Sequence, residues 1–230
     1  MSETTCSSLR SGLEIILIFS IGAILVLILP MLLGSGLLVQ QGIIGGTYLI
    51  CMVMIWYVLV RKEASWSDLG FQTGDRKFWV RTVLRSLIVF VIAMIAFILG
   101  GGISINLGLI SKAADMSGYD YLRGNLGMLL LSLLAIYLTS SLGEEVIYRG
   151  FLITRLGEIF GPHPWRKAGA VFISGIVFGL VHYNWGPMGI IQTTLMGWVL
   201  GYYYIRFDRN LWVTILAHVY MDTILLVQMY

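Results

Sequence analysis

Unbroken apolar runs of about 20 residues recur along the whole chain. A helix needs roughly 20 apolar residues to cross the ~30 Å hydrocarbon core of a bilayer, and it satisfies every backbone polar group internally. A membrane β-barrel would instead show alternating segments of about 10 residues. With 58% apolar and 12% charged residues, the chain also lacks the polar surface of a soluble domain. The sequence therefore predicts an all-α, polytopic transmembrane helical bundle.

The apolar pattern predicts about seven spans and leaves an eighth half-span or a re-entrant segment open. No linker or charge run divides the chain, so residues 1–230 are predicted to form a single integral membrane domain. The first run is longer than the core of a signal peptide, about 7–15 residues, and is predicted to be a retained span. The predicted spans are residues 13–34, 42–60, 86–110, 127–153, 168–190, 187–206 and 211–229.

Lysine and arginine residues gather in alternate connections between these spans. Twelve of the 15 fall on one side if the N-terminus is cytoplasmic, while the other side receives only Lys112 and Arg123, and Arg149 lies within a span. The positive-inside rule therefore predicts a multi-pass protein of the cell membrane with a cytoplasmic N-terminus. Residues 65–80 are too polar to cross, and their interleaved aromatic and basic residues predict a segment at the cytoplasmic interface.

Six ionisable residues lie inside the predicted spans, away from the span ends. An ionisable side chain near the bilayer centre costs about 2.5–3.5 kcal/mol on insertion scales, and such residues mark functional sites. Because the six residues come from three separate spans, packing alone does not account for them. We therefore predict a shared site in a cavity between the later helices. The six residues are Glu144, Glu145, Arg149, His182, His218 and Asp222.

The two adjacent glutamates are predicted to have different roles. On an α-helix Glu145 and Arg149 are four residues apart in the favourable acid-first order and can pair directly. Glu144 lies about 100° round the helix, and its own neighbour at that spacing is Tyr148 rather than a cation. A carboxylate without a counter-ion in a pocket of low dielectric can serve as a general base. We predict that Glu144 carries the chemistry and that Glu145 and Arg149 support it.

The two histidines of the later spans also sit in spaced pairs. His218 and Asp222 are four residues apart, so the aspartate could accept a hydrogen bond from the imidazole and fix its tautomer, or contact a water or metal. His182 follows Phe178 at the same spacing. Measured from the middle of each predicted span, Glu144, His182 and His218 lie within about one helical turn of the same depth. They are therefore predicted to meet in one layer.

This set of residues could support the splitting of water in two ways. If zinc is bound, His182 and His218 are natural ligands, with Glu144 or Asp222 as a third ligand or as the base. Without a metal, Glu144 and His182 could activate the water. His218 and Asp222 would then position the carbonyl or bind the developing oxyanion, the aspartate only if protonated. The sequence contains neither H-E-x-x-H nor G-x-S-x-G.

Three stretches resemble the ordered motifs of the CPBP family, the CAAX-processing and bacteriocin-processing intramembrane proteases, also called the Abi or Rce1-like family. They are Glu144-Glu145-VIY-Arg149, Phe178-GLV-His182 and His218-VYM-Asp222, which resemble E-E-x-x-x-R, F-x-x-x-H and H-x-x-x-N/D. The resemblance implies an endopeptidase with a catalytic core at about residues 127–229. It implies that Glu144, His182, His218 and Asp222 are catalytic. It leaves open a zinc-dependent or a metal-free glutamate mechanism.

The resemblance further implies a peptide or prenylated protein substrate at the lipid bilayer, processed as a CAAX protein or as a bacteriocin leader. Nothing in the sequence predicts a nucleic-acid partner. Two other classes are weighed against the hydrolase: a non-catalytic immunity or partner-binding protein of the same fold, and a proton-coupled transporter. The intact motifs argue against the first, and the lack of an inverted repeat argues against the second. The oligomeric state is not predicted.

Overall fold

The computed structural model describes residues 3–34, 36–109 and 117–230, and these residues are helical for most of their length. Two short 3-10 helices, η1 (Trp66–Leu69) and η2 (Ser117–Leu122), precede α3 and α4, and a third, η4 (Tyr183–Trp185), lies between α6 and α7. A π-helix, η3, joins α4 to α5 without a break. The longer elements are α1 (Glu3–Leu33), α2 (Leu37–Arg61), α3 (Arg76–Asn106), α4 (Leu126–Ile136), η3 (Tyr137–Leu152), α5 (Ile153–Phe160), α6 (Arg166–Leu180), α7 (Gly186–Arg206) and α8 (Leu211–Val227).

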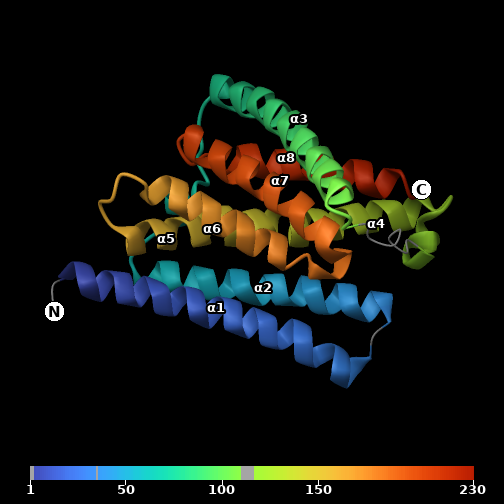
Figure 1. The fold of residues 1–230 in the computed structure, drawn as a ribbon, viewed down its shortest axis with the longest axis horizontal. Coiled ribbons are helices and arrows are strands. Elements are labelled where there is room, and N and C mark those ends of the chain that lie inside the picture. The colour runs from blue at the N-terminus through green and yellow to red at the C-terminus, as the bar shows by residue number, and fades with distance from the viewer. Residues whose placement is uncertain (1–2, 35, 110–116) are drawn as a thin grey trace.

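The helices run back and forth along one long axis, with the two chain ends at opposite ends of the bundle (Figure 1). Helices α1 and α2 form a hairpin on one side of the bundle, and α3 crosses α7 and α8 on the other side (Figure 1). The continuous helix α4–η3–α5 packs against both α2 and α8. The stretch with the adjacent glutamates is therefore enclosed between the N-terminal hairpin and the C-terminal helices.

Each of the seven predicted spans coincides with helical structure, which confirms the all-helical membrane class. By length and composition, four helices are apolar enough to cross a membrane, or five if the bent pair α6 and α7 forms one span. Helix α8 has 17 residues and is a shorter apolar helix. The number of seven crossings therefore stays a prediction.

Helices α6 and α7 pack as an antiparallel hairpin. An added Cβ on Gly175 of α6 would meet Trp198 of α7, and one on Gly201 of α7 would meet Val171 of α6. As one helix is followed forwards, the contacts on the other run backwards, so the chain reverses between them. Such close approach at glycine is typical of helix pairs in membranes.

The predicted span 168–190 is ten residues too long at its C-terminal end. Helix α6 ends at Leu180, and α7 begins at Gly186, which has a φ of 73°. The cause is Gly186-Pro187: proline has no backbone N–H to donate to the preceding turn, and it disfavours helical geometry in the residue before it. His182, predicted inside a helix, consequently lies in the turn between α6 and α7.

A pair of glycines on α3 tests the packing of α3 against α7. A Cβ on Gly100 would lie 2.8 Å from the Cα of Gln192 in α7, whereas one on Gly102 would meet nothing within 4 Å. We expect Gly100→Ala to lower stability by about 1–3 kcal/mol through overpacking. Gly102→Ala should leave stability unchanged or raise it by roughly 0.5–1 kcal/mol, because alanine is the better helix former. Thermal unfolding in detergent checks this, and equal effects of the two variants would contradict the packing.

A network of charged side chains joins α1, α2 and α5 at the end of the bundle that contains the N-terminus. Glu14 of α1 lies 3.2 Å from Nζ of Lys62 and 2.7 Å from Nε of Arg155. Glu158 of α5 lies 3.3 Å from Nζ of Lys62 and 2.6 Å from Nη1 of Arg155. Lys62 and Arg155 are among the twelve basic residues predicted on one side, and they do lie together. Lys112 falls outside the described residues.

The interfacial segment predicted at residues 65–80 is divided by the start of α3 at Arg76, so its last residues form the first turn of a long helix. The earlier part contains η1, where Asp68 forms a capping box with Ser65. The backbone N–H and the hydroxyl of Ser65 both donate to the carboxylate and hold the pKa of Asp68 below its usual value. Trp66, Phe71 and Trp212 pack edge to face beside this turn.

Candidate active site

The stretch with the adjacent glutamates is a π-helix rather than the predicted α-helix. Element η3 covers 16 residues, and the backbone N–H of Ile153 donates to the carbonyl of Tyr148, five residues earlier. The same carbonyl accepts a hydrogen bond of 2.9 Å from Oγ of Ser174 on α6. Widened helical turns of this kind are rare and occur frequently at functional sites.

Two glycines flank this stretch, and both lie where another element approaches closely. A Cβ on Gly143 would lie 3.3 Å from Cβ of Tyr48 on α2, and one on Gly150 would lie 3.3 Å from Cβ of Leu69 in η1. A side chain at either position would push the neighbouring element away. The two glycines therefore allow the N-terminal hairpin and η1 to press against the charged part of η3.

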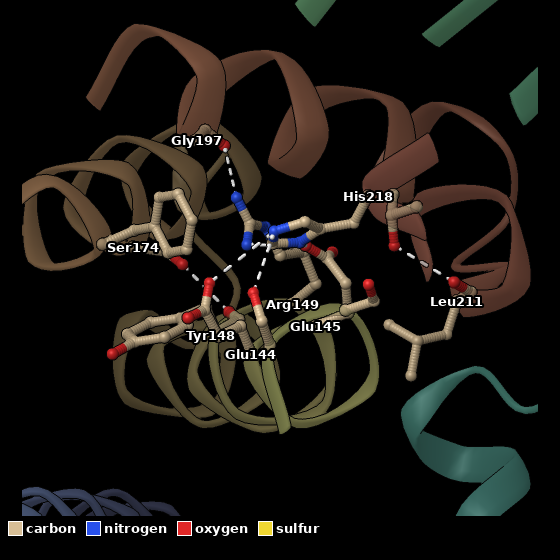
Figure 2. Close-up of polar contacts among 12 residues, drawn as sticks. Glu144, Glu145, Tyr148, Arg149, Ser174, Gly197, Leu211 and His218 are labelled. Carbon is tan, nitrogen blue, oxygen red and sulfur yellow. Dashed lines mark hydrogen bonds and ion pairs between the residues drawn. The ribbon is translucent and has the colours of Figure 1, made fainter. Parts of the chain in front are cut away.

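The predicted ion pair between Glu145 and Arg149 is present and buried. Nη1 of Arg149 lies 2.9 Å from Oε1 of Glu145, and the two side chains are 1% and 0% exposed. The same carboxylate oxygen lies 3.0 Å from Nδ1 of His218 on α8. Because a carboxylate can only accept, Nδ1 carries the hydrogen, and Glu145 fixes the orientation of the imidazole. Figure 2 shows these three side chains pointing toward one another between η3 and the C-terminal helices.

Arg149 is held on its other faces by α6 and α7. Its guanidinium lies over the ring of Phe178, with Cζ 4.2 Å from the ring centroid. Nη2 donates to the carbonyl of Gly197 at 3.5 Å, a long hydrogen bond that is drawn in Figure 2. A guanidinium over an aromatic face is stabilised by the ring quadrupole, more so where water is excluded. Arg149 thus connects η3 to two other helices, α6 and α7.

Glu144 has a different environment from its neighbour. Its Oε1 accepts a hydrogen bond of 2.7 Å from the hydroxyl of Tyr48 on α2. Its Oε2 has no hydrogen-bond partner and lies 3.8 Å from Nε2 of His218. The side chain is buried, with 5% of the residue exposed. Oε2 of Glu145 also lacks a hydrogen bond, but its carboxylate has Arg149 as a counter-ion. Of the two adjacent glutamates, Glu144 is therefore the one with an oxygen near Nε2 of the imidazole and no guanidinium beside it.

Asp222 faces the same imidazole but does not fix its tautomer, which was one of the two roles considered for it. Its Oδ2 accepts a hydrogen bond of 2.7 Å from Oγ of Ser141 and lies 3.9 Å from Nε2 of His218. The tautomer is fixed at the other nitrogen by Glu145. The packing of η3 against α8 places Glu145 beside Nδ1 of the ring, while Asp222 lies on the side of Nε2.

His182 stands apart from the cluster that the other residues form. Its Nδ1 lies 2.7 Å from the carbonyl of Phe178, and its ring lies 4.8 Å from the ring of Phe178 and 5.0 Å from that of Trp185, centroid to centroid. Since a carbonyl only accepts, Nδ1 is the donor, and Nε2 of the neutral ring is left as an acceptor. The ring of Phe178 contacts both histidines, at 4.8 Å and 6.4 Å. The predicted single layer is therefore formed by Glu144, Glu145, His218 and Asp222, with His182 beside it.

The donor atoms do not form a zinc site. A tetrahedral zinc needs three protein ligands at about 2.0–2.2 Å from one point. No group of three His, Cys, Asp or Glu side chains in the described part of the chain is arranged to hold a metal ion. His182 and His218, the two predicted zinc ligands, donate their Nδ1–H to the carbonyl of Phe178 and to Glu145, so only Nε2 of either ring could bind a metal.

Three partners of the site were missed by the sequence reasoning. Tyr48 comes from α2, and Ser140 and Ser141 precede the adjacent glutamates by about one helical turn, where Oγ of Ser140 lies 3.4 Å from Nε2 of His218. The only signal in the sequence is a hydroxyl within an apolar span, since a buried tyrosine hydroxyl needs a hydrogen-bond partner. No spacing along one helix could have assigned Tyr48 to Glu144, because the two residues lie 96 positions apart. The side chains of Glu144, Glu145, His218 and Asp222 are buried. The cavity predicted between the later helices therefore stays a prediction.

The comparison with known protein families points to the same part of the chain as the geometry of the site. Residues 126–224 match the family model described as Type II CAAX prenyl endopeptidase Rce1-like. Neither the curated proteins nor the solved structures gave a match. The matched range begins at α4 and includes every motif residue from Glu144 to Asp222, whereas α1 to α3 lie outside it. Residues 126–224 thus belong to the Rce1-like (CPBP) family of membrane proteases.

Proposed function

We propose that the protein hydrolyses peptide bonds within or beside the membrane, with Glu144 as the general base. The observation that carries the proposal is the arrangement at Glu144: one carboxylate oxygen is held by Tyr48, and the other lies 3.8 Å from His218 without a hydrogen-bond partner. A base needs such an unoccupied oxygen to take a proton from water. Glu145 is less suited to this part, because its charge is compensated by Arg149 and its Oε1 also accepts from His218.

The steps use only side chains of this chain. Glu144 takes a proton from a water molecule, whose oxygen attacks the peptide carbonyl. Nε2 of His218 donates to the developing oxyanion when the ring is protonated, with Nδ1 held by Glu145. The proton on Glu144 then passes to the leaving amine as the C–N bond breaks. Asp222, held by Ser141, borders the same space, and Nε2 of His182 accepts a hydrogen bond from substrate or water.

Non-catalytic immunity and proton transport are the competing proposals. A protein that only binds a partner has no need of a buried carboxylate with an oxygen left without a hydrogen bond, which costs free energy of about 1–3 kcal/mol or more. A proton relay would need a chain of such groups leading away from the site. The retention of Glu144 beside His218 favours the hydrolase.

The proposed substrate is a membrane-associated peptide of the CAAX type, with a bacteriocin or other leader peptide as the alternative. The test uses an internally quenched peptide with a farnesylated cysteine in a C-terminal C-a-a-X sequence, presented in liposomes that contain the protein. The same peptide without the farnesyl group is the matched control. Cleavage of the farnesylated peptide alone supports CAAX processing. Cleavage of both supports a peptidase that does not need the lipid, and cleavage of neither contradicts the CAAX proposal.

Zinc dependence gives a further prediction. Because the donor set does not form a three-ligand group, we expect purified protein to contain far less than one zinc per chain, with no difference between wild type and His218→Ala. Elemental analysis of both proteins after dialysis checks this. Stoichiometric zinc that His218→Ala removes would contradict the metal-free mechanism.

We further propose that the protein lies in the plasma membrane with its N-terminus in the cytoplasm. The charge network of α1, α2 and α5 supports the clustering of basic residues at one end of the bundle, which is the end that the positive-inside rule assigns to the cytoplasm. Labelling of single cysteines at exposed Arg10 and Arg123, replaced in turn, by a membrane-impermeant maleimide tests the orientation. Labelling of Arg10→Cys in intact cells would overturn it.

A further inference from the structure

Tyr48 lies in a part of the chain that the family match does not include, yet it contacts the proposed base. Its hydroxyl donates to Oε1 of Glu144 at 2.7 Å. A hydroxyl that donates to a carboxylate forms a charge-assisted hydrogen bond, whose oxygens are about 2.5–2.7 Å apart and which is roughly twice as strong as a neutral one. The contact is therefore of the kind that fixes a side chain rather than one that merely covers it.

The backbone around the contact is shaped to permit it. Gly143, next to Glu144, lets Cβ of Tyr48 approach to within 3.3 Å of the place where its own Cβ would lie. A bulkier residue there would move α2 outward and lengthen the hydrogen bond. The close approach of Tyr48 to Gly143 and its hydrogen bond to Glu144 thus join α2 to two adjacent residues of η3.

A second polar contact holds α2 in the same register farther along. Lys62, the C-cap residue of α2, lies 3.3 Å from Glu158 of α5. Lys62 follows Tyr48 by 14 residues, and Glu158 follows Glu144 by 14 residues. The two helices therefore run parallel, joined at two points about 21 Å apart along α2. A shift of α2 along its axis would break both contacts.

We propose that Tyr48 is a positioning residue that orients the carboxylate of Glu144 for catalysis. A glutamate side chain has three rotatable bonds, and fixing it costs conformational entropy unless a partner holds it. With Oε1 held by Tyr48, Oε2 is left directed toward His218, where the substrate water has to lie. The hairpin of α1 and α2 is then part of the active site. This inference rests on the proposed function of Glu144.

Replacement of the hydroxyl tests the positioning. Tyr48→Phe should lower kcat for the farnesylated CAAX peptide by about 10- to 100-fold, the effect of misplacing a reacting group by about 1 Å. KM should stay within about twofold, because the substrate is still bound. Tyr57→Phe is the matched control, since Tyr57 is an exposed residue of the same helix whose hydroxyl accepts from Arg61. Equal kcat for Tyr48→Phe and wild type would overturn the proposal, as would a loss expressed only in KM.

A second measurement needs no substrate. The unfolding temperatures of Tyr48→Phe, Glu144→Met and the double variant form a cycle, in which methionine keeps the volume of glutamate but accepts no such hydrogen bond. We expect the sum of the two single decreases in unfolding temperature to exceed the decrease in the double variant by about 2–4 °C. This is the shift for one hydrogen bond in a chain of this size. Additive effects would show that the contact is absent and overturn the positioning role. If the cycle shows coupling and wild type cleaves no CAAX peptide, the substrate proposal fails and the contact stands.

Discussion

Glu144→Gln is expected to lower kcat for peptide cleavage by about 10³-fold or more, with little change in unfolding temperature. The amide oxygen of glutamine can still accept the hydrogen bond from Tyr48, which is 2.7 Å from the carboxylate in wild type. The amide cannot take a proton from water, so the loss of general-base catalysis, commonly 10²- to 10⁴-fold, is separated from any loss of structure. Cleavage of the quenched CAAX peptide in liposomes measures the rate.

The control for this prediction is a variant that changes charge at a distance from the site. Glu63→Gln serves, because Glu63 follows α2 in the connection to η1. It should cleave at the wild-type rate. If Glu144→Gln retains more than about a tenth of wild-type kcat, Glu144 is not the base. Where Glu144→Gln is inactive as expected, proteins that differ between the membrane proteomes of cells with wild type and cells with the variant are the candidate natural substrates.

The all-helical membrane class was predictable because it depends on a local property of the chain. Each predicted span is an apolar run, and the run alone requires a helix, since only helices and closed barrels satisfy the backbone in lipid. The errors lie at the ends. Helix α3 begins at Arg76 because Asp75 accepts from the backbone N–H of Phe78 and caps the helix. A cap of this kind outweighs the polarity that the prediction relied on.

The candidate site was predictable to the extent that its residues lie four apart on one helix. The pair of Glu145 and Arg149 is an example, and it persists in the π-helix. Contacts between helices were not predictable in the same way. Spacing allowed Asp222 to accept a hydrogen bond from His218, whereas the packing of η3 on α8 gives that contact to Glu145. The partner of Glu144 came from α2, which no motif includes.

Arg149→Met is expected to destabilise the protein by about 3–5 kcal/mol, the cost of removing one member of a buried ion pair. The guanidinium is 1% exposed, lies 2.9 Å from Glu145 and is stacked on Phe178. Without it, three buried carboxylates (Glu144, Glu145 and Asp222) face one imidazole. The unfolding temperature in detergent should fall by roughly 6–20 °C for a chain of this size.

The double variant Glu145→Gln with Arg149→Met separates the ion pair from general damage to the helix. Removing both charges leaves no unpaired charge at this point, and the glutamine oxygen can still accept from Nδ1 of His218. We therefore expect the double variant to recover more than half of the lost stability, a strong departure from additivity. Glu144→Gln, in contrast, should leave stability near the wild-type value. If Arg149→Met were as stable as wild type, or if the double variant were less stable than Arg149→Met, the ion pair would not be what makes two adjacent glutamates tolerable within the membrane.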